Sequence, residues 1–233
     1  MTRSRTIAMA LAALAILTGI VIAVIPNGSS QTRGHSNRPS SAPPSAALPS
    51  SPVTPVVDVS GLHWTDFHGY RLPVSAQAGP RITASDLASG FADTPLGALV
   101  AMINIGARTA WQFGPGVFQP TIQSQVTGPY ASQMLSADLD AYGSGAAEIP
   151  DIGAYASFVA YQWAGYTPSD ATADLVVEGP GADGTTIFAA TQIQAQWIDS
   201  DWRVVAPPGG DWANSATQIP SLNGYLTFPG QEG

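Results

Sequence analysis

The sequence predicts an α+β protein: one N-terminal transmembrane helix, then a curved antiparallel sheet packed on a long helix. Three observations support this prediction. Residues 7–25 are uncharged and apolar, residues 95–111 show helical spacing, and residues 154–206 alternate as strands do. Helices followed by a run of antiparallel strands are typical of an α+β domain.

The apolar run at residues 7–25 is preceded by two arginines and ends at Pro26. A helix of this length extends about 28 Å, close to the thickness of the bilayer core. We therefore expect a single-pass cell-membrane anchor, with residues 1–6 in the cytoplasm and the C-terminal domain extracytoplasmic. The alternative is a cleaved signal peptide, but the run exceeds the usual apolar region and only Gly28 and Ser30 offer a cleavage site.

Composition separates a linker from a domain. Residues 26–56 are rich in Ser and Pro, cannot bury enough surface to offset the entropy of ordering, and are predicted to be a disordered linker. Residues 57–233 form the predicted extracytoplasmic domain, which carries four Arg and all sixteen Asp and Glu, a net charge of −12. This charge argues against direct nucleic-acid binding, which needs clustered Lys and Arg. The chain has no cysteine, which excludes disulfides and thiolate metal sites.

Residues 95–111 form the strongest predicted helix. Thr94 supplies the N-cap and Pro95 the first helical position. We expect Gly97 and Gly106, which weaken helix propensity, to allow another element to approach closely. The apolar side chains form one stripe at spacings of three and four: Leu96, Leu99, Val100, Ile103, Ala107, Ala110 and Trp111.

Weaker helices are predicted at residues 120–126 and 129–142, before the strands. We expect Asp199-Ser200 to turn the chain, with Trp197 and Trp202 paired across the turn. The predicted strands are 154–165, 174–178, 185–198 and 201–206. In the third, Gln192, Gln194 and Gln196 face one way, opposite Ile187, Ala189, Thr191, Ile193, Ala195 and Trp197. In the first, one side should carry Tyr155, Ser157, Val159, Tyr161 and Trp163.

The sequence lacks the common catalytic and phosphate-binding motifs, including G-x-S-x-G and G-x-x-x-x-G-K-[ST]. We therefore expect no enzyme activity, no cofactor and no metal. His63 and His68 are five residues apart, a spacing that suits neither one helix face nor one strand face as a metal pair. We expect both to bond locally in a turn that Asp66 caps. An acid/base enzyme remains the less favoured alternative, with its residues drawn from Asp93, Asp174, Tyr155 and Tyr161.

All six tryptophans lie in the predicted domain. The favoured interpretation is that they pack in the core, whereas the alternative is an exposed surface for a partner or ligand. The residues of that possible surface are Trp64, Tyr161, Trp163, Trp197 and Trp202.

Three stretches carry a resemblance to known proteins: W-x-x-F-x-G-x-x-L-P from Trp64 to Pro73, Gly79-Pro80, and G-F-A-x-T-P-x-G-A from Gly90 to Ala98. Over about residues 60–206 the chain resembles a little-characterised family of membrane-anchored actinobacterial proteins, often encoded in plasmids and integrative conjugative elements. The predicted architecture is also similar to bitopic scaffold subunits of type IV secretion systems, whose extracytoplasmic domain is a nuclear-transport-factor-2-like cone.

These resemblances imply a non-enzymatic, single-pass envelope protein. Its extracytoplasmic domain would bind protein partners in a conjugative transfer or secretion assembly. The alternative is a membrane-tethered or secreted module that binds a small molecule, a lipid or a glycan.

Overall fold

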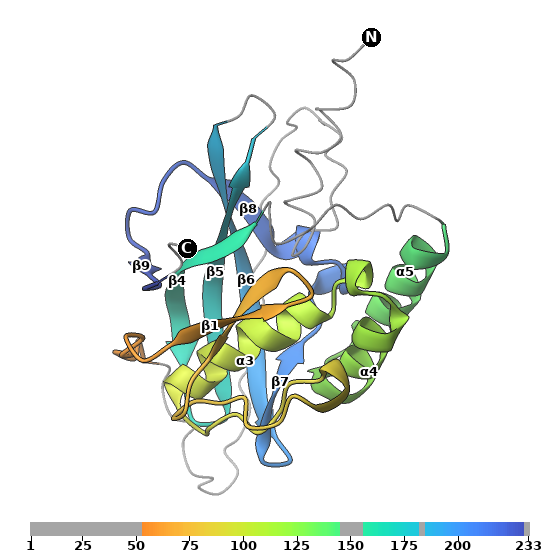
Figure 1. Cartoon of the computed structure of the whole chain (residues 1–233), viewed down its shortest axis with the longest axis horizontal. Coiled ribbons are helices and arrows are strands. Elements are labelled where there is room, and N and C mark those ends of the chain that lie inside the picture. Colours follow the sequence, from red (N-terminus) through yellow and green to blue (C-terminus); the bar gives the residue numbers. More distant parts are fainter. Residues whose placement is uncertain (1–52, 145–155, 182–184, 231–233) are drawn as a thin grey trace, which may run out of the picture.

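A computed structural model describes residues 53–144, 156–181 and 185–230 of the chain. Helix α3 (Pro95–Arg108) lies between a seven-stranded sheet on one side and the β1–β2 hairpin on the other (Figure 1). Helices α4 (Pro115–Gln125) and α5 (Ala131–Gly143) pack against each other beside α3. The hairpin therefore covers the side of α3 that faces away from the large sheet.

The strands and short helical turns complete the fold. The strands are β1 His63–Phe67, β2 Tyr70–Val74, β3 Val126–Thr127, β4 Ser157–Tyr166, β5 Asp170–Pro180, β6 Thr186–Ile198, β7 Asp201–Val205, β8 Ala216–Ile219 and β9 Leu226–Thr227. The 3₁₀ turns are η1 Ala84–Asp86, η2 Trp111–Phe113, η4 Pro208–Gly210 and η5 Trp212–Ser215. The large sheet has the order β3-β7-β6-β5-β4-β9, with β8 also paired to β6.

Strand β6 is the longest strand and confirms the predicted alternation. Ile193 and Ala195 are fully buried, whereas Gln192 and Gln194 are exposed. The predicted turn at Asp199-Ser200 is also present, with both residues at positive φ (53° and 66°) as a type I′ hairpin requires. Trp197 and Trp202 pair across it, with ring centroids 5.4 Å apart.

Strand β4 departs from the predicted alternation because it contains register shifts between Phe158 and Ala160 and between Trp163 and Gly165. Such a bulge moves one extra residue into a strand and exchanges the faces of the residues beyond it. Phe158, Tyr161 and Trp163 are therefore all buried in the main core, although Phe158 was predicted on the other side from the two aromatics.

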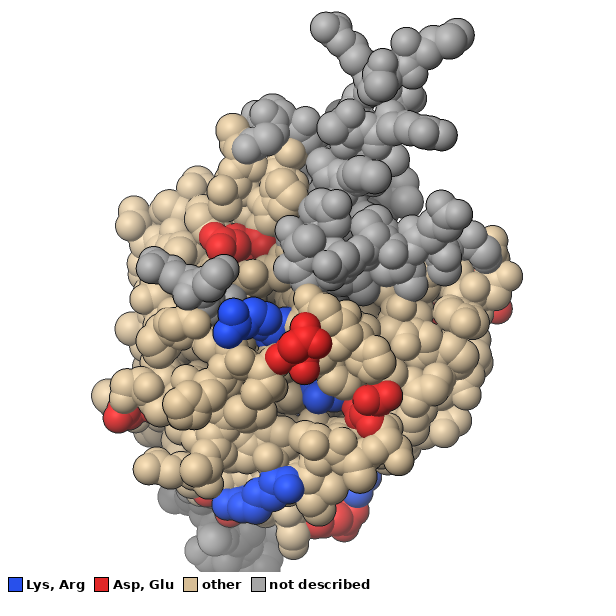
Figure 2. Space-filling model, in the orientation of Figure 1, with Lys and Arg blue, Asp and Glu red and all other residues tan. Residues whose placement is uncertain are grey.

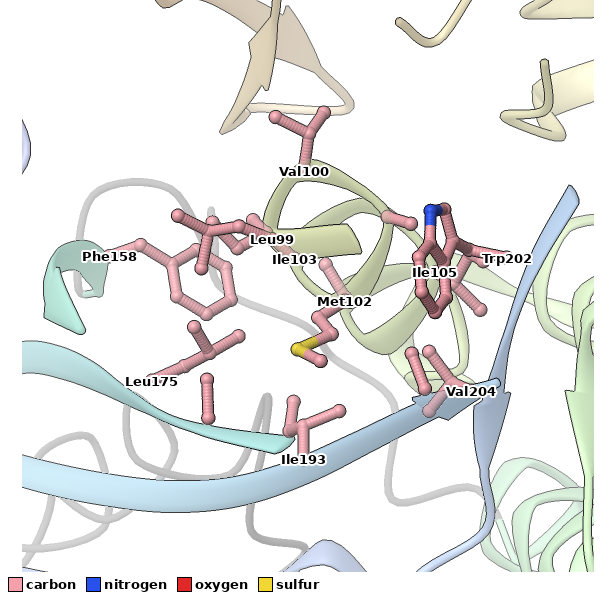
Figure 3. Close-up of a cluster of buried hydrophobic side chains, with 14 of the residues drawn as sticks. Leu99, Val100, Met102, Ile103, Ile105, Phe158, Leu175, Ile193, Trp202 and Val204 are labelled. Carbon is pink, nitrogen blue, oxygen red and sulfur yellow. The ribbon is translucent and has the colours of Figure 1, made fainter. Parts of the chain in front are cut away.

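Helix α3 is buried all round, because every residue from Gly97 to Arg108 is buried. Leu99, Met102 and Ile103 point toward Phe158, Leu175 and Ile193 of the sheet, while Val100 points to the opposite side of the helix (Figure 3). The predicted N-cap is confirmed, since the side chain of Thr94 accepts a hydrogen bond from the backbone N–H of Gly97 at 3.0 Å.

The predicted fold class is wrong. In place of one long helix under a curved antiparallel sheet, the described residues form a mostly β-sheet domain with three helices of 14, 11 and 13 residues. The β3–β7 pair is parallel, and the hairpin forms a second sheet. Helix α4 begins at Pro115 and contains Pro120, which was predicted to start a helix. The sequence rules placed each helix start at a proline, but tertiary packing tolerates one inside α4.

The predicted single-pass membrane protein is also not supported. Among the described residues, no helix has both the length and the apolar character needed to cross a membrane. The predicted anchor at residues 7–25 lies outside the described residues. Val53, inside the predicted linker, forms an antiparallel bridge with Tyr166, and the two backbone hydrogen bonds measure 3.1 and 2.9 Å. The folded part therefore includes Val53, which lies four residues before the predicted start of the domain.

Candidate functional site

The side of α3 that faces the hairpin carries two buried polar residues. Asn104 is 1% exposed and Arg108 is 4% exposed. With Val100 they stand four residues apart, so all three lie on one face of the helix. The amide nitrogen Nδ2 of Asn104 donates to the carbonyl of Pro73 in β2 at 2.8 Å and to the carbonyl of Val100 at 3.0 Å. Asn104 thus ties α3 to the hairpin.

Arg108 uses part of its guanidinium to join α3 to the chain before it. Its Nε donates to the backbone carbonyl of Asp86 at 2.9 Å, and its Nη1 donates to the carbonyl and the Oδ1 of Asn104 at 3.0 and 2.7 Å. Its Nη2 makes no hydrogen bond to the described residues. One edge of the guanidinium therefore has no hydrogen-bond partner among the described residues.

Side chains from the β1–β2 hairpin, η1 and η2 form a connected set of contacts beside this guanidinium. Its Cζ lies 4.0 Å from the ring centroid of Phe67, a cation–π contact. The ring of Phe67 also packs edge-on against His68 and Phe113, at centroid distances of 4.6 and 5.3 Å. His68 Nε2 lies 3.4 Å from Asp86 Oδ1. We call Phe67, His68, Asp86, Asn104 and Arg108 the Arg108 site.

The backbone around the Arg108 site is strained. Among the described residues, five that are not glycine have positive φ, and three of them lie at or next to this site: His68 at 52°, Ser85 at 54° and Asp86 at 63°. Left-handed backbone at residues with a side chain costs free energy, and such residues are concentrated at functional sites. At His68 this conformation belongs to the type I′ turn of the hairpin, whereas Ser85 and Asp86 adopt it within η1.

The electrostatics of the site favour binding of an anionic group. Burial lowers the pKa of Arg108 to about 10, against the opposing effect of Asp86, so the guanidinium stays charged at neutral pH. No described carboxylate lies within ion-pair distance of it, since the described carboxylates that lie this close to a basic side chain are Asp86, beside His68, and Asp199, beside Arg203. A buried charge without a counter-ion is costly, and a carboxylate from outside would complete the pair.

The residues that carry the family resemblance hold this region together. Phe91 and Gly90 donate their backbone N–H groups to the carboxylate of Asp201, at 3.0 and 2.8 Å. The carbonyl of Ala92 accepts the indole N–H of Trp202 at 2.9 Å. These contacts fasten the segment before α3 to strand β7, so the motif sets the position of the helix that presents Arg108.

Comparison with known proteins places the chain in one family. A family model described as a domain of unknown function, DUF8175, matches residues 25–227. The chain belongs to this family. No curated protein and no solved structure gives a significant match. The DUF8175 match includes the segment predicted to be a linker, along with the Arg108 site.

The DUF8175 domain buries most of the aromatic residues that were predicted as a possible surface. Tyr161, Trp163 and Trp202 are 1%, 6% and 1% exposed, so they cannot form an exposed patch. Trp64 and Trp197 are partly buried and pack against the same core. The indole of Trp64 donates to the carbonyl of Pro229 at 3.0 Å, whereas Trp163 Nε1 has no hydrogen-bond partner among the described residues.

The DUF8175 domain does not bring the alternative catalytic residues together. Asp174 lies on the polar face of β5, where Gln192 donates to its carboxylate at 3.3 Å, whereas Tyr161 faces the core. Asp93 directly precedes the N-cap of α3, and Tyr155 lies outside the described residues. Asp66 was expected to cap a turn, and its Oδ1 accepts a long hydrogen bond of 3.5 Å from the N–H of Gly69 in the β1–β2 turn.

Two functional candidates escaped the sequence analysis. Arg108 is the last residue of an otherwise uncharged helix, and this single charge is the feature of the sequence that could have identified it. Asp138 lies one turn after the buried Met134 on α5, and its Oδ2 has no hydrogen-bond partner among the described residues. Burial, with a smaller contribution from the nearby carboxylate of Asp211, raises the pKa of Asp138 to about 7. Nothing in the sequence pairs Asp138 with Asp211, because they are 73 residues apart.

Proposed function

We propose that the DUF8175 domain is a non-enzymatic module that binds a protein partner through the surface around the Arg108 site. The observation that carries this proposal is the free edge of the Arg108 guanidinium, which has no carboxylate partner among the described residues. Arginine and aromatic side chains dominate the binding energy of protein interfaces. Here they occur together, because Phe67 covers the guanidinium and Phe113 packs beside it.

The surface around the site supports this proposal. On this face, charged side chains of both signs are scattered over a largely uncharged surface (Figure 2). This face therefore shows no continuous basic field of the kind that would favour nucleic acid over a protein partner. The resemblance of the Trp64–Pro73 stretch supports placing the partner in a conjugative transfer or secretion assembly.

Site-specific photocrosslinking tests the proposal. A benzophenone amino acid replaces Thr65, an exposed residue whose side chain lies on the same face of β1 as Phe67. The matched control replaces Gln194, an exposed residue on the polar face of β6. We expect irradiation of cells that make the full chain to yield a discrete protein adduct from position 65 and none from position 194. Adducts from neither position, or equally from both, would refute partner binding at this surface.

A further inference from the structure

Asp86 makes two different contacts in the Arg108 site. Its backbone carbonyl accepts the Nε of Arg108 at 2.9 Å, while its carboxylate faces the imidazole of His68 at 3.4 Å. The carboxylate is thus close enough to influence Arg108 electrostatically without forming an ion pair with it. The His68 and Asp86 side chains are 48% and 49% exposed, so both can exchange partners at the surface.

The turn that contains His68 does not by itself require a histidine. His68 and Gly69 form a two-residue hairpin loop with φ values of 52° and 83°. Asn-Gly is the sequence that a type I′ turn favours most, because asparagine tolerates left-handed backbone well. The imidazole makes its contacts with Asp86, Phe67 and Phe113. Its position therefore points to a role in the Arg108 site.

We infer that the free Nη2 of Arg108 binds one carboxylate of the partner protein, and that His68 is a positioning residue that keeps Nη2 open by holding the Asp86 carboxylate. The inference rests on the proposed function and specifies the group that the partner presents. Without the imidazole, Asp86 is free to turn toward Arg108 and complete the ion pair within the chain. The site would then be closed by its own carboxylate.

The chemistry of the site selects a carboxylate over a phosphate. The two N–H groups of Nη2 point in different directions, and one oxygen of a carboxylate can accept a charge-assisted hydrogen bond from one of them. A phosphate dianion needs more positive charge, and the region downstream of residue 55 carries −12 with Asp86 adjacent to the site. Arg203 provides a comparison within the chain, since its Nη2 already pairs with a carboxylate, that of Asp199, at 2.7 Å.

The test is a titration of the full chain with sodium acetate, followed by the side-chain ¹⁵N–¹H signals of Arg108. Sodium chloride at the same ionic strength and inorganic phosphate are the comparison titrations. We expect acetate to shift the Arg108 signals saturably and chloride to leave them unchanged. The Arg203 signals should not respond, because that guanidinium is already paired. Absence of a saturable acetate shift, or tighter binding of phosphate than of acetate, would overturn the inference.

Three variants separate the role of His68 from a structural one. His68→Asn keeps the turn and should weaken acetate binding about three- to fivefold, as expected for gain of a competing surface ion pair. Asp86→Asn keeps the left-handed backbone and should strengthen acetate binding by a similar factor. The double variant should bind acetate as Asp86→Asn does. Unchanged binding in His68→Asn, or failure of Asp86→Asn to restore binding in the double variant, would refute the positioning role. The acetate titration needs no partner protein, so the result of this titration is independent of the result of the crosslinking experiment.

Discussion

The Gly97→Ala variant should unfold at a markedly lower denaturant concentration than the native chain, although alanine is the better helix former. Gly97 lies in the first turn of α3, where an added Cβ would collide with the carbonyl oxygen of Ala92. The same Cβ would also stand 2.8 Å from the carbonyl carbon and 3.0 Å from the nitrogen of Ala92. Relief therefore requires the backbone at Ala92 to move.

That backbone is held from three directions. The carbonyl of Ala92 accepts hydrogen bonds from the N–H of Thr94 at 2.8 Å and from the indole N–H of Trp202 at 2.9 Å. The backbone N–H of Ala92 donates to the carbonyl of Ala78 at 3.0 Å. Each hydrogen bond contributes about 1 kcal/mol, and overpacking adds about 1–3 kcal/mol. Alanine recovers about 1 kcal/mol of helix propensity. If all three hydrogen bonds are lost, we expect a net loss of about 3–5 kcal/mol for Gly97→Ala.

The matched control is Gly116→Ala in the first turn of α4, where an added Cβ has no neighbour within 4 Å. This change should leave stability unchanged or raise it by up to about 1 kcal/mol. Urea unfolding of the two variants and the native chain measures the difference, and the indole ¹⁵N–¹H signal of Trp202 reports the displacement of Ala92. A Gly97→Ala variant as stable as the native chain would show that this approach is not rigid, and the reasoning would fail.

Asp138→Asn should remove a pH-dependent loss of stability. The pKa of Asp138 is raised from 3.8 to about 7 in the folded state. The free energy of unfolding is therefore not reduced by this residue below about pH 4, and it falls as the pH rises from about 4 to about 7. Urea unfolding at pH 8 should find the variant more stable by up to about 4 kcal/mol, with a smaller difference at pH 4.5; equal differences at both pH values would contradict this. Asp201→Asn should destabilise the domain by about 1–3 kcal/mol, because an amide cannot accept all three N–H groups of Gly90, Phe91 and Trp202 that the carboxylate accepts. Its control, Asp199→Asn at a 76% exposed side chain, should change unfolding by less than about 1 kcal/mol, and similar losses in both would refute the role given to Asp201.

Local sequence determined those parts of the fold that depend on neighbours in the chain. Thr94 caps α3 as predicted, since an N-cap bond joins residues only three apart. The alternation in β6 and the turn at Asp199-Ser200 were confirmed for the same reason, because strand periodicity and a two-residue turn are set by consecutive residues. The core role favoured for the tryptophans was confirmed for Trp163 and Trp202, whose burial follows from their large apolar surface.

Tertiary structure alone decided the rest. The bulges in β4 depend on its partner strand, and the hairpin that buries the outer side of α3 comes from a distant stretch of sequence. Arg108 became a candidate site because β1, η1 and α3 meet around it, and no sequence spacing encodes that meeting. The raised pKa of Asp138 likewise comes from folding, mainly through burial and to a smaller extent through Asp211, which folding brings close. A periodic pattern records which side of an element is apolar, whereas burial of a charge depends on what packs against it.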